Sequence, residues 1–193
     1  MQSIALAILQ GLTEFLPISS SGHLVIVRAI FDWSDEGGLL YDTLLHAGSL
    51  AALLIYFWRD WLAILQGYAQ PRVRSLSWQR RLPWLLLVAT LPVALAGPLL
   101  KPWLESALVL RNPRMVGLSM LATAVFFWLS ERRLAAGRAA PEAGALGFRQ
   151  ALIIGLLQVV ALLPGASRSG WTTGAGMLFG QARPAAIRFA FWM

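Results

Sequence analysis

The sequence predicts an all-α polytopic membrane protein in which two re-entrant helix hairpins meet within the bilayer. Hydrophobic residues make up 58% of the 193 and charged residues only 13%, with a mean hydropathy of +0.63. Soluble domains carry about 25% charged residues, so the chain lies outside that class. Apolar runs recur between short arginine-bearing loops, and one polar motif occurs twice among them. These observations predict helices that enter and cross a membrane.

The excess of basic residues fits a membrane protein better than a nucleic-acid-binding one. The formal net charge is +7, but the arginines lie mostly in loops beside apolar runs. Cations in such positions face anionic lipid headgroups. We therefore expect membrane lipids, and no nucleic acid, as partners. The chain has no cysteine, which excludes disulfides and thiolate chemistry.

The first hairpin is predicted at residues 3–32. Residues 10–23 read QGLTEFLPISSSGH and lie between two apolar runs. A helix from Ser3 to Leu16 rises only about 20 Å, short of the roughly 30 Å hydrocarbon core. Pro17 and the serines after it end that helix and favour the start of another. A polar turn of this kind survives at depth only when it is buried in protein or lines a water-filled cavity.

The second motif repeats the first 148 residues later. Gln10 falls on Gln158 and Ser19 on Ser167, which predicts a second re-entrant hairpin at 148–181. Three spanning helices are expected between the hairpins, at about 42–65, 82–104 and 115–134. An odd number of crossings brings the second hairpin in from the opposite face, so the sequence predicts inverted repeats.

The predicted organisation is one full repeat and one partial repeat. The first covers residues 1–135, a linker covers 136–147, and the second covers 148–193. The start of another spanning helix is expected at 183–193, and this run is too short to cross a bilayer. We therefore expect the chain to be C-terminally truncated, with an incomplete second repeat.

Arg168 is the residue most indicative of function. Residues 164–172 read PGASRSGWT, so the arginine lies between hydroxyl side chains in apolar sequence. A cation at bilayer depth costs about 3 kcal/mol or more and needs a partner. The guanidinium fork suits phosphate oxygens, and neighbouring hydroxyls and glycine amides add donors. The motif predicts an anion site.

Glu14 needs a partner at the same depth. Gln10 and Glu14 are four residues apart and share a helix face. A buried carboxylate is neutral, paired with a cation, or bound to a metal. Two alternatives stay open here: an ion pair with Arg168, or a divalent cation held between Glu14 and substrate phosphate.

The cluster of Ser19, Ser20, Ser21 and His23 has two interpretations. A serine needs a base to become a nucleophile, and His23 lies about one turn along a helix that starts at this cluster. The alternative is a helix cap whose histidine binds a nearby carbonyl. His46, in contrast, has no catalytic neighbours in sequence, and we expect it to be a structural histidine.

At these two motifs the sequence resembles the bacterial undecaprenyl-diphosphate phosphatases of the bacitracin-resistance type. The family's first signature is Glu or Gln, three residues, Glu, and then a Pro-x-Ser-Ser-x-Gly-His stretch; the second is Pro-Gly-x-Ser-Arg-Ser-x-x-Thr. Both are complete here. The resemblance implies a multi-pass hydrolase of the bacterial inner membrane that removes the terminal phosphate of undecaprenyl diphosphate. This recycles the lipid carrier for peptidoglycan synthesis and confers bacitracin resistance.

The resemblance also implies roles for particular residues. It implies dependence on Mg²⁺ or Ca²⁺ and a site that faces the periplasm or cell exterior. Because position 10 is Gln and not Glu, Glu14 is the one carboxylate of this motif that a metal could bind. The catalytic positions are Ser20, His23, Glu14 and Arg168, and the phosphate-binding positions are Gln10, Ser19, Ser167, Ser169 and Thr172.

The expected mechanism has Ser20 attack the terminal phosphorus with His23 as general base. In the competing assignment His23 is the nucleophile or activates water, and Ser20 only positions phosphate. The alternative function is a lipid or anion transporter or flippase, because inverted repeats with broken helices are also transporter architecture. Such a carrier needs the arginine and hydroxyls but no activated nucleophile.

Overall fold

The computed structural model describes residues 2–33, 38–70, 77–106, 112–137 and 146–193. Within these ranges the regular structure is helical and contains no strand, which confirms the predicted all-α class. The elements in chain order are α1 (Gln2–Thr13), α2 (Ser20–Phe31), α3 (Gly38–Tyr56), α4 (Trp58–Ala69), α5 (Ser77–Ser106), α6 (Pro113–Ala136), α7 (Phe148–Gln158), the 3₁₀ turn η4 (Val159–Leu162), α8 (Arg168–Leu178) and α9 (Arg183–Trp192).

Two helices among the described residues are long and apolar enough to cross a membrane unbroken. They cover Ser77–Leu104 and Pro113–Ala136, close to the predicted crossings at 82–104 and 115–134. The crossing predicted at 42–65 is instead two helices, α3 and α4, bent by 58°. The bend falls at Phe57, whose ring is buried and packs edge-on against Trp192 at 6.0 Å between centroids. Burial of this ring accounts for the break, since no proline or glycine lies there.

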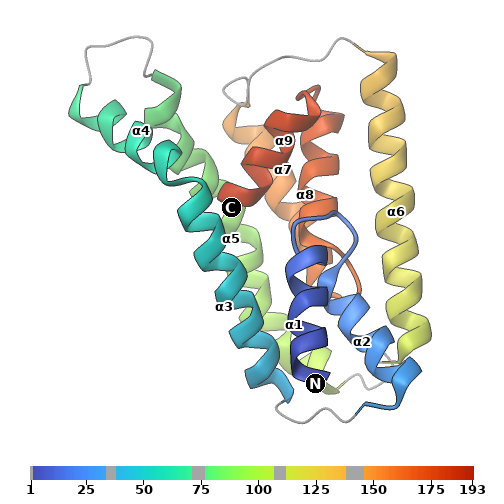
Figure 1. The fold of residues 1–193 in the computed structure, drawn as a ribbon. Coiled ribbons are helices and arrows are strands. Elements are labelled where there is room, and N and C mark those ends of the chain that lie inside the picture. Colours follow the sequence, from blue (N-terminus) through green and yellow to red (C-terminus); the bar gives the residue numbers. More distant parts are fainter. Residues whose placement is uncertain (1, 34–37, 71–76, 107–111, 138–145) are drawn as a thin grey trace.

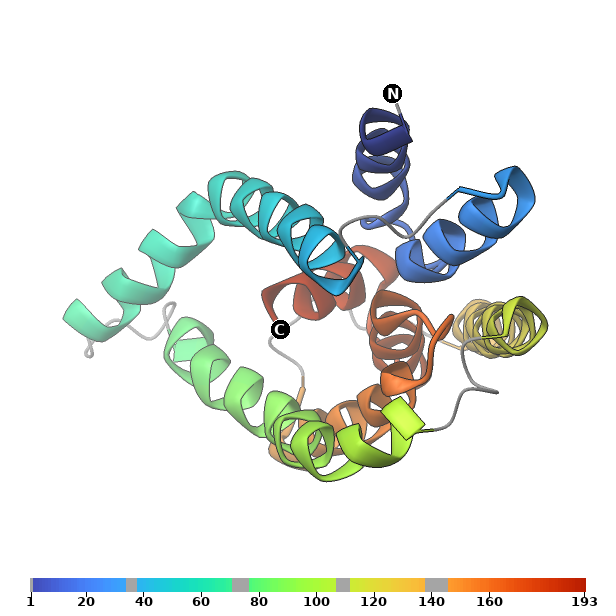
Figure 2. The ribbon, with the colours of Figure 1, turned by 90° about the horizontal axis from the view of Figure 1, so that it is seen from below.

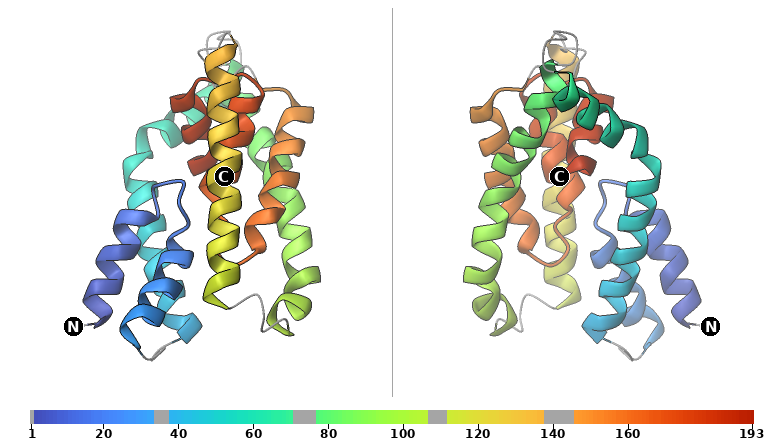
Figure 3. Two further views of the ribbon diagram at one scale, coloured as in Figure 1. Left: turned by 90° about the vertical axis from the view of Figure 1, so that its right-hand side faces the viewer. Right: turned by 90° about the vertical axis from the view of Figure 1, so that its left-hand side faces the viewer.

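Two short helix hairpins lie between the longer helices, as expected. One is α1 with α2; the other is α7 and η4 with α8. Figures 1 and 3 show that they point in opposite directions and that their connecting segments meet near mid-height. The inverted repeat itself stays a prediction, and most of the expected linker 136–147 lies outside the described residues.

The second hairpin is held by close helix packing. Helix α7 packs against α5, and α8 packs against α6 and α9 (Figure 2). A Cβ atom at Gly155 of α7 would collide with the carbonyl of Ala89 on α5. Small residues that let backbones approach are typical of helix contacts in membranes. This contact fixes the hairpin against a spanning helix.

The long helices turn apolar side chains outward and polar ones inward. Leu99 on α5 is 79% exposed and Leu121 on α6 is 60% exposed, while Thr123 and Ser130 on α6 are buried. Within a bilayer the outward leucines face lipid chains, and the inward hydroxyls bond to backbone carbonyls one turn earlier. The described part of the chain therefore has the surface of a membrane-embedded protein.

Candidate active site

A cavity of about 580 Å³ lies where the two hairpin tips meet α3. It joins parts of the chain that are far apart in sequence. Its polar lining comes from the α1–α2 turn, from the start of α8 and from one face of α3. The lining residues are Glu14, Leu16, Ser19, Ser20, Ser21, Thr43, His46, Ala47, Ser49, Leu50, Leu53, Ala161, Ala166, Ser167, Arg168 and Ser169.

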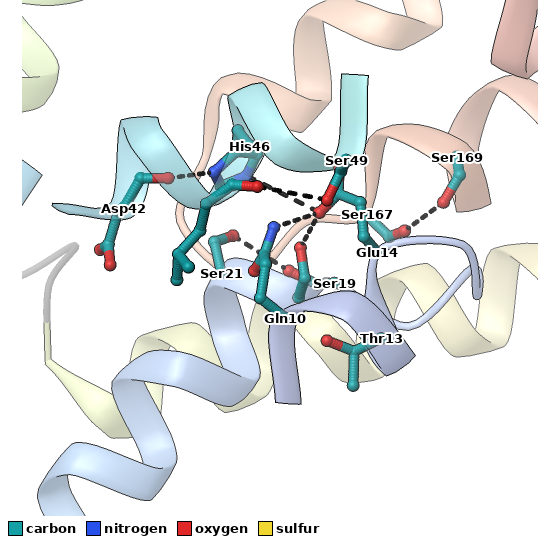
Figure 4. A network of polar contacts seen from close by, with 12 residues as sticks. Gln10, Thr13, Glu14, Ser19, Ser21, Asp42, His46, Ser49, Ser167 and Ser169 are labelled. Atoms are coloured by element: carbon teal, nitrogen blue, oxygen red, sulfur yellow. Dashed lines mark hydrogen bonds and ion pairs between the residues drawn. The ribbon is translucent and has the colours of Figure 1, made fainter. Parts of the chain in front are cut away.

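Glu14 is the centre of the polar contacts in this cavity (Figure 4). Its Oε2 accepts a hydrogen bond from Gln10 Nε2 at 2.7 Å and a short one from the Ser20 hydroxyl. The same oxygen lies 3.7 Å from His46 Nε2. Because the Ser20 hydroxyl donates to it, this carboxylate is already in place to accept the serine proton.

The first hairpin turns so that α2 begins at the cavity. Its cap is Ser19, whose Oγ accepts from Gly22 N at 3.3 Å. Ser19 has φ +66°, a left-handed conformation that costs a non-glycine residue energy and needs support from its surroundings. The first amides of α2 have no acceptor within the helix and carry partial positive charge. They provide an anion site at this end of the cavity.

The second hairpin also begins a serine-capped helix at the cavity. Ser167 caps α8, with its Oγ accepting from Gly170 N at 3.1 Å. Since Ser169 Oγ donates to the carbonyl of Leu16 in the first hairpin (3.2 Å), its oxygen accepts from the Ser167 hydroxyl, 3.2 Å away. This directed chain of hydroxyls ties the two hairpin tips together. Gly165, at φ +85°, makes the turn that precedes it.

Arg168 opens α8 with an exposed side chain at the cavity. In the described part of the chain no salt bridge joins it to Glu14 or to another carboxylate. The structure therefore does not contain the ion pair between Arg168 and Glu14, which was one of the two alternatives for the carboxylate. The guanidinium is left available to an anion.

His23 lies on the first turn of α2, as expected, but the structure does not join it to Ser20. Its Nδ1 lies 2.7 Å from the Ser19 carbonyl, so this nitrogen donates. No hydrogen bond links His23 to Ser20 or Glu14 among the described residues, and His23 is not part of the cavity lining. The proton acceptor that the structure gives Ser20 is Glu14.

Two further expected site residues lie behind the cavity wall. Gln10 is buried, with its Nε2 on Glu14 and its Oε1 without a partner among the described residues. Thr172 is also buried and donates to the carbonyl of Arg168 at 2.8 Å. Both support residues that line the cavity.

Two residues near the site were not expected from the sequence. His46, predicted to be structural, lines the cavity next to Glu14. Thr123 on α6 accepts from Ser167 N and from Trp171 Nε1, both at 3.2 Å, and so holds the start of α8. Both come from regular helices without a local motif, and only spatial proximity identifies them.

Comparison with known proteins agrees with the two motifs. The family model described as bacitracin resistance protein BacA matches residues 3–193. Curated proteins named undecaprenyl-diphosphatase are similar along nearly the whole chain. The one from Magnetococcus marinus is 41% identical over 97% of this chain and 69% of its own length. Those from Moorella thermoacetica and Idiomarina loihiensis are 39% and 41% identical over all of this chain and 70% and 71% of their own lengths. The family expected from the motifs is confirmed: the chain belongs to the bacitracin resistance protein BacA family.

Proposed function

We propose that this chain is an undecaprenyl-diphosphatase, a phosphoric anhydride hydrolase that converts undecaprenyl diphosphate to undecaprenyl phosphate and phosphate. One observation carries the proposal. The Ser20 hydroxyl donates to the Glu14 carboxylate in a cavity that also contains Arg168, which has no carboxylate partner among the described residues. A nucleophile, a proton acceptor and an anion clamp are therefore together. The name that its relatives carry supports the same reaction.

In the proposed reaction the Ser20 oxygen attacks the terminal phosphorus and its proton passes to Glu14. The bond from that phosphorus to the bridging oxygen breaks, and undecaprenyl phosphate leaves. Water then hydrolyses the phosphoserine, releases phosphate and restores the hydroxyl. Arg168 and the amides at the starts of α2 and α8 stabilise the negative charge of the transferring group. Ser19 binds phosphate oxygens, while Ser167 and Ser169, whose hydroxyl hydrogens are used between the hairpin tips, hold the loops.

His23 is the alternative nucleophile or base in this proposal. Its Nδ1 donates a hydrogen bond to the Ser19 carbonyl, so only Nε2 is available for the reaction. Trapping of the phosphorylated enzyme followed by peptide mapping shows whether Ser20 or His23 is the nucleophile. Phosphate on Ser20 supports Ser20 as the nucleophile, and phosphate on His23 overturns that role.

The residues present fit a divalent cation of the Mg²⁺ type. Glu14 is the one carboxylate in the cavity lining, and no group of three or more His, Cys, Asp or Glu side chains is found among the described residues. Mg²⁺ commonly uses one or two carboxylates together with substrate phosphates and water. The unpartnered oxygen of Gln10 is buried behind Glu14 and is not part of the cavity lining. A bound Mg²⁺ or Ca²⁺ would be held by Glu14 and would neutralise phosphate charge.

The lipid tail and the membrane side are further parts of the proposal. A second cavity of about 930 Å³, lined mainly by α3 and α9, shares Leu53 with the first. We place the start of the prenyl chain at Leu53, where the two cavities adjoin. We also propose an inner-membrane location with the cavity facing the periplasm or exterior. Since the chain has no cysteine, a Ser21→Cys variant labelled by a membrane-impermeant maleimide from that face only would support this orientation.

The test is release of phosphate from undecaprenyl diphosphate by the purified protein, with Mg²⁺ and with chelator. Ser20→Ala and Arg168→Ala are compared with Ser21→Ala, a neighbour in the same turn with no assigned role in the reaction. We expect metal-dependent release that Ser20→Ala and Arg168→Ala abolish and Ser21→Ala retains. If well-folded protein binds the lipid without releasing phosphate, and Ser20→Ala binds it equally well, the transporter alternative replaces this proposal.

A further inference from the structure

The second cavity combines an apolar lining with a charged one. It lies where α3, α4 and α9 meet, and its volume of about 930 Å³ is in the range of small-molecule pockets. The apolar part of the lining includes Leu53, Phe57, Ile187 and Phe191. The charged part, which the proposed reaction does not use, consists of Arg59, Asp60, Arg183 and Arg188. A ligand that fits such a cavity has an apolar part and a polar part.

The charged lining carries one positive charge that no carboxylate offsets. Arg188 Nη2 donates to both oxygens of Asp60, at 2.7 and 2.9 Å. Arg183 forms a salt bridge with Glu131 of α6 at 2.6 Å. Among the described residues no salt bridge joins Arg59 to a carboxylate. The lining therefore complements a ligand that carries one negative charge.

The bend between α3 and α4 indicates the depth of this charge in the bilayer. Helix α3 is apolar up to the bend, where α4 turns away by 58° (Figure 1). Helix α4 opens with Trp58, which is 53% exposed, and Arg59, whose guanidinium carbon lies 5.5 Å from the centre of the Trp58 ring. Exposed tryptophan is typical of the headgroup region, and a guanidinium over its ring is attracted to it. Arg59 is therefore expected at the level of lipid phosphates, with the apolar lining deeper.

We propose that the second cavity binds an anionic glycerophospholipid of the surrounding bilayer, with the phosphodiester at Arg59 and an acyl chain along Ile187 and Phe191. A phosphodiester carries one negative charge, which matches the charge left in the lining. Its lipid has phosphate at the interface and chains below it, the same order as Arg59 and the apolar residues. Phosphatidylcholine adds a cation of its own, so we expect the site to prefer phosphatidylglycerol. This site is separate from the proposed reaction, whose phosphates lie in the first cavity.

The experiment measures lipid binding by native mass spectrometry of the purified protein, titrated with phosphatidylglycerol or with phosphatidylcholine of the same acyl chains. Arg59→Gln removes the charge. Arg114→Gln is the matched control, because Arg114 is an exposed arginine in the first turn of α6 that lines neither cavity. Ala52→Phe narrows the apolar part of the second cavity. Thermal unfolding of each variant shows whether it is folded.

The unaltered chain is expected to bind phosphatidylglycerol more tightly than phosphatidylcholine. Arg59→Gln should weaken phosphatidylglycerol binding roughly fivefold, the contribution of one basic residue at an anionic membrane surface. Arg114→Gln should leave it unchanged, and Ala52→Phe should weaken the binding of both lipids.

Four results would overturn the inference. Equal affinity of the unaltered chain for both lipids is one, and an unchanged preference in folded Arg59→Gln is another. An equal loss in Arg114→Gln would mean that the basic surface attracts anionic lipid without a site. Displacement of phosphatidylglycerol by undecaprenyl phosphate would assign the cavity to the prenyl chain. None of these results depends on phosphate release, so failure of the proposed function is recognised separately.

Discussion

Replacing Thr123 with valine tests whether the second hairpin depends on a hydroxyl contributed by α6. The Thr123 Oγ1 accepts from Ser167 N and Trp171 Nε1 and donates to the Ser119 carbonyl. Valine has the same shape and leaves both N–H groups without an acceptor. Trp171 is only half-buried and has room to find another partner, but Ser167 is 3% exposed and does not. An orphaned buried donor costs about 1–3 kcal/mol, so we expect a loss of that size.

The loss has two measurable consequences. The unfolding midpoint of Thr123→Val should fall by a few degrees. Phosphate release should also fall about tenfold, because the loop that presents Arg168 is no longer held. Thr123→Ser is the matched control, since it keeps the hydroxyl and removes only a methyl group. If Thr123→Val equals the unaltered chain in both assays, the hydrogen bonds to Ser167 and Trp171 do not support the site and the reasoning fails.

Three other changes test separate contacts. Arg168→Lys keeps the charge but loses the fork of donors, so we expect kcat/KM to fall at least tenfold at unchanged unfolding temperature; equal activity would mean that charge alone suffices. Gly155→Ala should lower the unfolding temperature, because the added methyl collides with the Ala89 carbonyl; a stable variant would contradict the close packing of α5 and α7. Gln10→Glu places a second carboxylate beside Glu14, and like charges in contact need a cation between them. We expect half-maximal activity at a severalfold lower Mg²⁺ concentration, measured by metal titration; an unaltered requirement would argue against a metal at Glu14.

The hairpins were predictable because their breaks have local chemical causes. Pro17 cannot continue a helix and the serines after it cap one, so α2 begins at Ser20, within the range expected. The bend in the first expected crossing has no such cause. Residues 56–58 read YFW, and the break is decided by burial of Phe57 against Trp192, a residue from the last helix. No local pattern contains that contact.

The candidate site divides in the same way. That Glu14, Ser20 and Arg168 lie near one another was predictable, because charged and hydroxyl side chains at bilayer depth need polar partners. The contributions of His46 and Thr123 were not. Thr123 bonds to a residue 44 positions away, and His46 looks like any helical histidine bonded to a carbonyl one turn earlier. Their positions at the site follow from which helices the fold brings beside the hairpin tips.

The placement of charge around the cavity explains why a diphosphate suits it better than a neutral lipid. Both α2 and α8 begin at the cavity, and each is capped by a serine that accepts from the amide three residues on. The amides between each capping serine and that residue are not used by the cap, so they remain available to an anion in the cavity. The two helix starts therefore add positive potential to that of Arg168. Against these stands a single carboxylate, Glu14, which already receives donors from Gln10 and Ser20. An anion entering the cavity gains from the two helix starts and from Arg168, while the carboxylate stays next to the Ser20 hydroxyl, whose proton it accepts in the proposed reaction.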